Sequence, residues 1–284
     1  MRRPGSFVRW AALVPNDAAQ LGPLATLPGV WVGNGLTLVS LPDAEHGKPF
    51  RVQLNETREV LTFTLIDGPI ADRGSKQQDV FFRGLRYLQQ IQDRQTTELL
   101  HLETGLLLHM PATSSPQRDA CVARLATIPH GDAVLATGPY HTTLGPPRIA
   151  EANAIPSGHA VSAAYVEAFL RSARPKEIPA EAVVDPNVVL RAAIRGAQIV
   201  ETTTLELSTS GDGGIVNVPF VTLNARPTTV AARMWIENIR TAPGRETLQL
   251  QYSQRVDLEF DGIVWPHVSV ATLTKRAPPP RGDS

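Results

Sequence analysis

The stretch Trp265–Lys275 (WPHVSVATLTK) decides how the chain is interpreted, because its residues alternate with the period of a β-strand. His267, Ser269, Ala271 and Leu273 share one face of this strand. That face therefore presents an imidazole followed by two small side chains. A large flat ligand that lies against the small residues can take a bond from the imidazole. The stretch predicts a half-buried strand whose histidine faces the inside of a β-barrel.

Strand-like runs occupy most of the chain before this stretch, separated by turn signals. They are Glu59–Ile66, Val80–Gln92, Leu99–Met110, residues 120–128 and 132–140, Gln198–Ser208, Ile215–Leu223, Thr229–Arg240 and Thr247–Phe260. A helix is the rival interpretation for Val80–Gln92, whose leucines also suit a helical spacing. Ser210–Gly214 is interpreted as a hairpin turn. The pattern predicts an all-β fold, a closed antiparallel up-and-down β-barrel of about ten strands with a helical insertion.

We expect one barrel domain over residues 1–284, with three appended segments. Residues 1–27 form an N-terminal lid, residues 141–197 form a helical insertion or lid, and residues 277–284 form a flexible tail. The insertion is rich in proline and alanine and contains two helix candidates, Ala160–Ser172 and Pro186–Gly196. For the second helix the expected N-cap is Asp185.

Composition limits the classes of function. Lys plus Arg equals Asp plus Glu at 27 each, so no net charge attracts nucleic acid or an anionic membrane. No apolar run reaches the ~20 residues that span a bilayer. The single cysteine, Cys121, excludes an intramolecular disulfide and any site with several cysteine ligands. We therefore expect a soluble cytoplasmic protein that binds a small molecule, with neither nucleic acid nor membrane as a partner.

Common metal, nucleotide and hydrolase motifs are missing from the sequence. The histidines are therefore the main candidates for functional side chains. His267 is either a satisfied structural residue or a ligand for haem iron. His101, Glu103 and His109 share a strand face and form either an imidazole–carboxylate site or a solvated face. His130, in Pro-His-Gly-Asp, is interpreted as part of a turn.

Three motifs resemble those of the nitrobindin-like haem-binding β-barrels, which are related in shape to lipocalins and fatty-acid-binding proteins. Gly29–Gly35 (GVWVGNG) is similar to the family's G-x-W-x-G-x-G. Leu100–Gly105 (LHLETG) is similar to its L-H-x-E-x-G, and His267–Lys275 (HVSVATLTK) to its closing H-x-x-x-A-x-L-x-R/K. The chain looks closest to a longer subgroup described as haem-binding proteins. The resemblance covers residues 27–140 and 198–276, and residues 141–197 have no counterpart in compact members.

The resemblance implies a cofactor, haem b, with its iron ligated by His267. It places His101 near the opposite side of the pocket, where we predict a catalytic role. The predicted cofactor-binding residues are His267, Trp31, Gly33, Gly35, Ser269 and Ala271, although Trp31 alone reads as a core plug at the barrel end. Family members bind nitric oxide and isomerise peroxynitrite at ferric haem, so the resemblance implies a ligand of this kind.

Two other functions fit the same residues. The first is a non-catalytic, lipocalin-like carrier of haem or another hydrophobic molecule, because the sequence contains no recognisable covalent or acid–base machinery. The second is a peroxidase-like haem enzyme in which His101 or His109 assists peroxide cleavage as an acid–base group.

Overall fold

The computed structural model describes residues 20–75, 77–172 and 174–276. Its strands are β1 (Gly29–Asp43), β2 (Lys48–Leu65), β3 (Ile70–Asp72), β4 (Val80–Asp93), β5 (Leu99–Met110), β6 (Thr113–Ser114), β7 (Gln117–Arg118), β8 (Cys121–Ile128), β9 (Asp132–Gly138), β10 (Tyr140–Leu144), β11 (Ile199–Ser208), β12 (Gly214–Asn217), β13 (Arg226–Ala242), β14 (Arg245–Phe260) and β15 (Ile263–Lys275). Its helices are η1 (Gly22–Leu24), η2 (Ala44–His46), α2 (Ala163–Leu170), η3 (Ala180–Val183), α3 (Val188–Ala193) and α4 (Pro219–Leu223).

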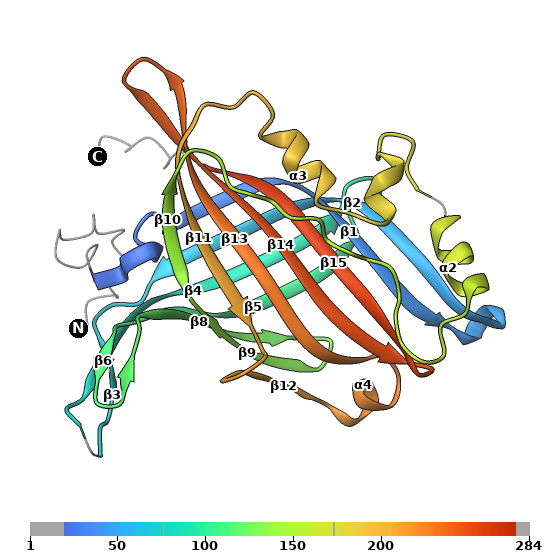
Figure 1. The fold of residues 1–284 in the computed structure, drawn as a ribbon, viewed down its shortest axis with the longest axis horizontal. Helices are drawn as coiled ribbons and strands as arrows, with labels where there is room; N and C mark the ends of the chain where they lie inside the picture. Colours follow the sequence, from blue (N-terminus) through green and yellow to red (C-terminus); the bar gives the residue numbers. More distant parts are fainter. Residues whose placement is uncertain (1–19, 76, 173, 277–284) are drawn as a thin grey trace, which may run out of the picture.

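Ten of the described strands form a closed ring (Figure 1). Their order is β1-β2-β4-β5-β8-β9-β11-β13-β14-β15, and β15 pairs with β1. The ring closes because Ser208 at the end of β11 pairs with Thr137 on β9. Neighbours in the ring are antiparallel and follow the chain order. The predicted closed up-and-down barrel of about ten strands with a helical insertion is confirmed, and Val80–Gln92 is a strand rather than a helix.

One end of the barrel is plugged by the segment that precedes β1. Leu21, Leu24 and Leu27 are fully buried in the main core. Trp31 is fully buried beside them, and its indole N–H donates to the Leu27 carbonyl over 2.7 Å. Trp31 therefore is the predicted core plug at the barrel end. Because this end is filled, any cavity lies toward the other end.

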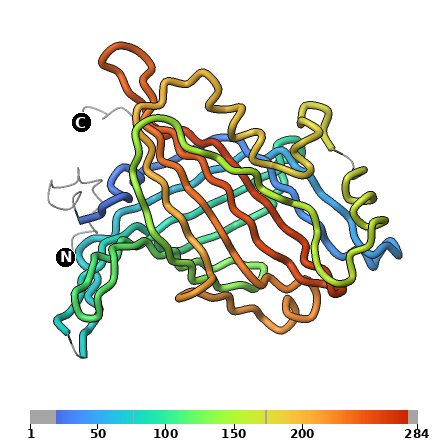
Figure 2. The backbone as a smooth tube through the Cα atoms, in the orientation of Figure 1, coloured from blue at the N-terminus to red at the C-terminus, as the bar shows by residue number. Residues whose placement is uncertain are grey.

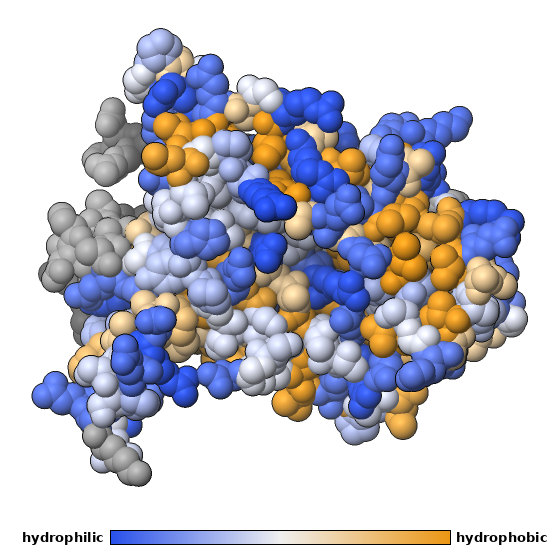
Figure 3. All heavy atoms as spheres, in the orientation of Figure 1, coloured by the Kyte–Doolittle hydropathy of each residue, from blue (hydrophilic) through white to orange (hydrophobic). Residues whose placement is uncertain are grey.

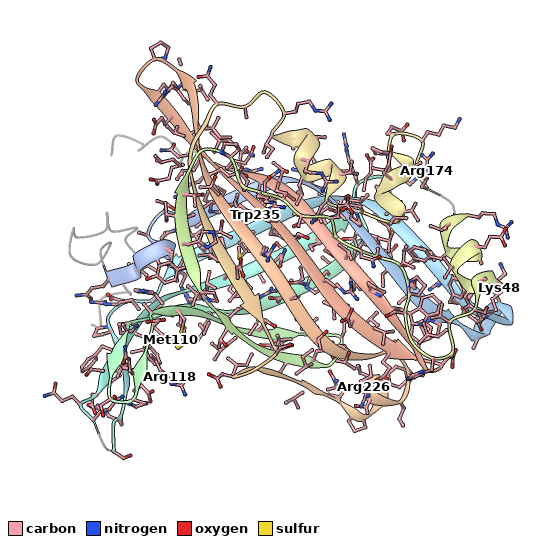
Figure 4. All side chains as sticks on the ribbon, in the orientation of Figure 1. Lys48, Met110, Arg118, Arg174, Arg226 and Trp235 are labelled. Carbon is pink, nitrogen blue, oxygen red and sulfur yellow. The ribbon has the colours of Figure 1, made fainter. Side chains whose placement is uncertain are left out.

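The insertion covers the outside of the barrel. Phe169 of α2 and Leu190 of α3 are buried in one cluster with Leu38, Trp235 and Val268, which point outward from their strands. Figure 2 shows the tube of residues 145–160 crossing the outer face of the strands, and Figure 4 labels Trp235 beneath α3. As a result, β15 is buried on both faces rather than half-buried as predicted from its alternation.

The insertion also covers a seam. The ladder between β1 and β15 ends at the pair Leu38–Val268, so the first residues of β15 have no β1 partner. There Ser157 takes the place of β1 and exchanges two backbone hydrogen bonds with Val264, of 2.9 and 2.7 Å. Arg255 of β14 adds a bond of 2.8 Å to the Asn153 carbonyl. The insertion thus satisfies the backbone of β15 beyond the point where β1 leaves it.

Two predictions about the segment between β11 and β13 are wrong in detail. Ser210–Gly214 is not a hairpin turn, because β11 and β12 both run alongside β9 in the same direction. The segment between them is a bulged loop that interrupts the pairing of this part of the chain with β9. The strand predicted over Ile215–Leu223 ends at Asn217, since Pro219 lacks a ladder N–H and begins α4.

The helices of the insertion are shorter than predicted, and the second begins at Val188. Asp185 does not act as its N-cap. Its carboxylate instead accepts from the backbone N–H of Ala152 and Asn187, over 2.8 and 3.1 Å, and from Arg191. It ties two parts of the insertion together.

Two parts of the predicted organisation lie outside the described residues, namely residues 1–19 of the N-terminal lid and the tail 277–284. Among the helices that are described, none has the length and apolar character needed to cross a membrane.

Candidate functional site

A cavity of about 360 Å³ occupies the barrel at the end opposite the plug. This volume falls within the range of about 300–1,000 Å³ that is common for small-molecule sites. Half of the residues that line it are apolar and half are polar. It is lined by Thr37, Val39, Leu41, Gln53, Asn55, Gln89, Ile91, Leu100, His101, Glu103, Arg124, Ile128, His130, Asp132, Val134, Ile215, Val221, Ala225, Pro227, Val230, Tyr252, Gln254, Val256, Leu258, His267 and Ser269. None of the described residues of the insertion belongs to this lining.

The strands β14, β15 and β1 form one side of the cavity, which we call the His267 wall. A tight Asp261–Gly262 turn with positive φ values of 54° and 71° joins β14 to β15. This hairpin pairs His267 with Val256, so the imidazole has an apolar neighbour in the cavity. The Ser269 hydroxyl lies 3.4 Å from His267 Nε2 and 3.1 Å from the Thr37 hydroxyl.

His267 is partly exposed to the cavity and carries no charge at neutral pH. Burial, together with the nearby charges of His101 and His130, lowers its pKa to about 4. A neutral imidazole has a free lone pair, which is the form that binds a metal.

The strands β4, β5, β8 and β9 form the opposite side, which we call the His101 wall. In the ring, β8 lies opposite β15, and β5 and β9 flank β8. A β-bulge at Leu100 shifts the register between β4 and β5 just before His101. The bulge turns both Leu100 and His101 toward the cavity. The two walls therefore present imidazoles to each other across one space.

Glu103 is the centre of a buried polar network in the His101 wall. Its Oε1 accepts from Arg124 Nε over 3.0 Å and from the hydroxyl of Tyr87, and its Oε2 accepts from His101 Nε2 over 3.3 Å. Arg124 also donates to the side chain of Gln254. Burial alone would raise the pKa of Glu103, but Arg124 and these hydrogen bonds lower it to about 2. Glu103 is therefore ionised and fixed in place.

His130 and Asp132 extend this wall from the turn between β8 and β9 into β9. The ring centroids of His101 and His130 are 5.7 Å apart. Burial and the charge of His101 lower the pKa of His130. Asp132 is 9 % exposed, and its buried Oδ1 has no hydrogen-bond partner within the described part of the chain. Burial raises the pKa of Asp132, against the attraction of the two histidines.

A second buried carboxyl, Glu59 of β2, lies deeper in the barrel and has no cation partner among the residues that the structure describes. It accepts from Tyr252 over 2.7 Å, from Gln89 over 3.4 Å and from Thr57 over 3.2 Å. Burial raises its pKa to about 7 against these hydrogen bonds. Its charge is not compensated in the way that Arg124 compensates Glu103.

Of the residues predicted to form the site, His267, Ser269 and His101 line the cavity together. Ala271 and Trp31 belong to the core on the plug side. Gly33 and Gly35 are packed against the backbone of β15, where a Cβ would come within 2.0 and 2.2 Å of carbonyl oxygens. Their lack of a side chain permits this close strand packing. Contact of these four residues with a cofactor stays a prediction.

His109 lies at the plug end rather than at the cavity. Its ring is hydrogen-bonded to the Gln20 carbonyl over 2.8 Å and to the Tyr140 hydroxyl over 3.0 Å. It shares a strand face with His101 and Glu103 as predicted, but the barrel is long enough to separate them into different environments. The structure assigns it to anchoring the segment before β1.

Sequence reasoning missed four residues of the His101 wall: His130, Asp132, Arg124 and Tyr87. The Pro-His-Gly-Asp turn holds two of them, and its signal was read only as turn chemistry. Arg124, Tyr87, Glu59 and Glu103 occupy positions that face into the barrel. The other inward-facing positions of the same strands include apolar residues. A charged or phenolic residue at an inward position of a barrel strand is therefore the signal that could have found them.

The residues present fit a haem. A neutral imidazole projects from one wall beside Val256, with the Ser269 hydroxyl 3.4 Å from its Nε2, and the opposite wall carries polar groups that a ligand on the iron could reach. Within the described ranges, no three His, Cys, Asp or Glu side chains are arranged to hold a bare metal ion. A haem needs only one such ligand from the protein.

No protein-family model matches the chain, and no curated protein is similar to it in sequence. Among solved structures, the chain is similar to Rv2717c from M. tuberculosis with 18% sequence identity and a TM-score of 0.46. That match covers 94% of this chain and 100% of the other. The class of this protein is therefore defined by its own strand pairing and cavity: it is a closed β-barrel with an internal cavity.

Proposed function

We propose that this protein binds haem b in the cavity, with His267 as the axial ligand of the iron, and acts on a small reactive nitrogen or oxygen species. The observation that supports the proposal is a neutral imidazole, partly exposed, on the wall of a closed-barrel cavity of about 360 Å³. The three motifs that resemble nitrobindin-like barrels support it independently.

The two walls would have different roles, one in holding the haem iron and the other in contacting its ligand. When bound, the haem would supply an iron that can take a small ligand. His267 would hold the iron, and Val39 and Val256 would exclude water around it. His101, held by Glu103, would contact the ligand from the opposite wall.

Hemin titration tests this proposal. Wild-type protein should give a sharp Soret band with one hemin per chain, and His267→Ala should abolish or strongly shift it. His141→Ala is the matched control, because His141 is exposed on β10 and outside the cavity lining, so it should bind hemin like wild type. An unchanged Soret band in His267→Ala would remove the axial-ligand claim.

A non-catalytic carrier of a hydrophobic molecule is the second candidate function. It is favoured by the apolar half of the lining and by the apolar surface next to the cavity. Val216 of β12 and Phe220 and Leu223 of α4 are 74%, 75% and 83% exposed, and α4 and the residues after it contribute Val221 and Ala225 to the lining. Figure 3 shows apolar residues at the surface near β12 and α4. Mass spectrometry of ligand extracted from purified protein separates the two functions, because lipid without iron favours the carrier.

A further inference from the structure

We propose that residues 214–225, which comprise β12 and α4, are the gate through which an apolar ligand enters the cavity. We call them the gate segment, and they lie along the lower edge of the barrel in Figure 1. The sequence offered the insertion as a lid, but none of its described residues lines the cavity. The inference goes beyond the proposed function, because it holds for haem and for another hydrophobic ligand.

Two strand junctions at the cavity end of the ring lack a continuous backbone ladder, and the chain treats them differently. Where β1 leaves β15, the insertion fills the junction, and Ser157 exchanges two backbone hydrogen bonds with Val264. At the other junction, β12 pairs with β9 but with no residue of β13 among the described strands. A single described hydrogen bond joins β12 to β13, from the Asn217 side-chain amide to the Pro227 carbonyl over 3.0 Å. The second junction is therefore the weaker one.

β13 is the fixed side of this junction, because its first residues are tied to β14. The Thr229 hydroxyl donates to the Asp257 carboxylate over 2.8 Å, and Arg226 forms an ion pair with Glu259. The gate segment is the side that can move.

The gate segment is held loosely. No residue from 214 to 225 is buried, whereas Phe169 and Leu190 anchor the insertion in a buried cluster. A segment with few buried contacts opens locally at a low cost in free energy. On the side away from β13, the Val218 N–H donates to the Gly131 carbonyl over 2.9 Å. A Cβ at Gly131 would come within 2.4 Å of Val218 Cγ2, so the glycine lets the gate segment rest on the turn between β8 and β9.

The path through the gate is apolar on both sides, which defines the class of ligand. Ile215 and Val221 of the gate segment and Pro227 and Val230 of β13 line the cavity along this path. A molecule that passes between such side chains loses its hydration without gaining hydrogen bonds, which costs little for an apolar molecule and much for an ion. The ligand is therefore a weakly hydrated molecule with an extended apolar surface.

Thiol labelling tests the gate without haem. In the full chain carrying Cys121→Ser, the substitution Ser269→Cys places one thiol on the cavity wall, and its reaction with N-ethylmaleimide is followed by mass spectrometry. Asn217→Ala removes the bond between β12 and β13, so the gate should open more often and labelling should become roughly three- to tenfold faster. Asn217 lies outside the cavity lining, so this change leaves the surroundings of the thiol intact.

Asn187→Ala is the matched control. It removes the same kind of bond within the insertion, from the Asn187 side-chain amide to the Ala150 carbonyl over 2.8 Å, and labelling should keep its original rate. Val218→Ala loosens the contact with Gly131 and should also speed labelling. Labelling that is unchanged in both Asn217→Ala and Val218→Ala, or that becomes faster only in Asn187→Ala, would overturn the inference.

Hemin binding gives a second measurement. Because a ligand passes the gate in both directions, Asn217→Ala should raise the association and dissociation rates of hemin by the same factor and leave Kd unchanged. Opposite changes in the two rates would overturn the inference, because they would place Asn217 in the binding site. Failure of hemin to bind, with faster labelling in Asn217→Ala, would instead overturn the proposed function alone.

Discussion

The His267 wall and the His101 wall are built from the same kind of antiparallel strand, yet they are buried differently on their outer faces. On the His267 wall, Leu38, Val268 and Val270 point outward and are 0% exposed, because the insertion covers them. On the His101 wall, Leu125 and Leu135 point outward and are 37% and 40% exposed. The comparison teaches that the outer face of a barrel strand is core or surface according to what packs on it.

The inner faces differ in how they treat charge. The His267 wall places its imidazole beside apolar Val256 and the uncharged hydroxyls of Ser269 and Thr37, and burial keeps the ring neutral. The His101 wall holds Glu103 and Arg124 as an ion pair, and their mutual attraction keeps both charged. One wall thus presents a neutral imidazole to the cavity, and the other presents polar groups that are fixed by hydrogen bonds.

Removing the cation of the His101 wall should have the largest effect on stability. Arg124→Met leaves the fully buried carboxylate of Glu103 without its partner. We expect a loss of about 3–5 kcal/mol in the free energy of unfolding, measured by urea denaturation. The double variant Arg124→Met, Glu103→Leu should recover most of this loss, because it leaves no uncompensated charge.

Arg233→Met is the matched control for that variant. Arg233 is 48% exposed and faces Glu206 at 3.6 Å on the barrel surface, so its removal should cost less than about 1 kcal/mol. A loss for Arg124→Met as small as that for Arg233→Met would contradict the assignment of a buried ion pair to the His101 wall.

A Leu→Ala substitution on the outer face of each wall tests whether the insertion buries the outer face of the His267 wall. Leu38→Ala empties a fully buried site between β1 and the insertion, and should cost about 3 kcal/mol. Leu125→Ala, at a partly exposed outward position of β8, should stay within about 1 kcal/mol. Urea unfolding of both variants measures the difference. Equal losses would mean that the insertion does not bury the His267 wall in solution.

A pH dependence of stability is expected from two buried carboxyls that have no cation partner among the described residues. Burial raises the pKa of Glu59, and of Glu237 on the outer face of β13, from 4.5 to about 7. Between these values the folded protein keeps protons that the unfolded chain has lost, so stability falls as pH rises from 4.5 to 7. Each group contributes at most about 1.4 kcal/mol per pH unit.

Glu59→Gln should therefore flatten this slope and leave the part due to Glu237. The measurement is the free energy of unfolding at several pH values across that window, compared with Glu45→Gln, an exposed site in η2 that should keep the wild-type slope. If the free energy of unfolding of Glu59→Gln changed with pH as steeply as that of wild type, the pKa of Glu59 in the folded protein would be the ordinary one.

Much of the barrel was predictable because strand alternation and turn residues are local. Asp261 and Gly262 determine a tight turn, and the parity of His267 follows from it. The His101–Glu103 pair was also predictable, since residues two apart on a strand share a face. The bulged loop at 209–213 was not, because strands that flank glycine-rich turns usually pair with each other, and here both pair with β9.

The sequence by itself determined which side chains point into the barrel and which point out, because that depends only on the period of the strand. It also determined that His101 shares a face with Glu103, and His267 with Ser269 and Ala271. Only the tertiary structure decided that His130, Asp132 and Arg124 join His101 opposite His267, because that depends on how the ring closes. It also decided that the insertion covers the outside of β15. Apolar outward residues such as Val268 and Val270 indicate that this face is covered, but they do not indicate which segment covers it.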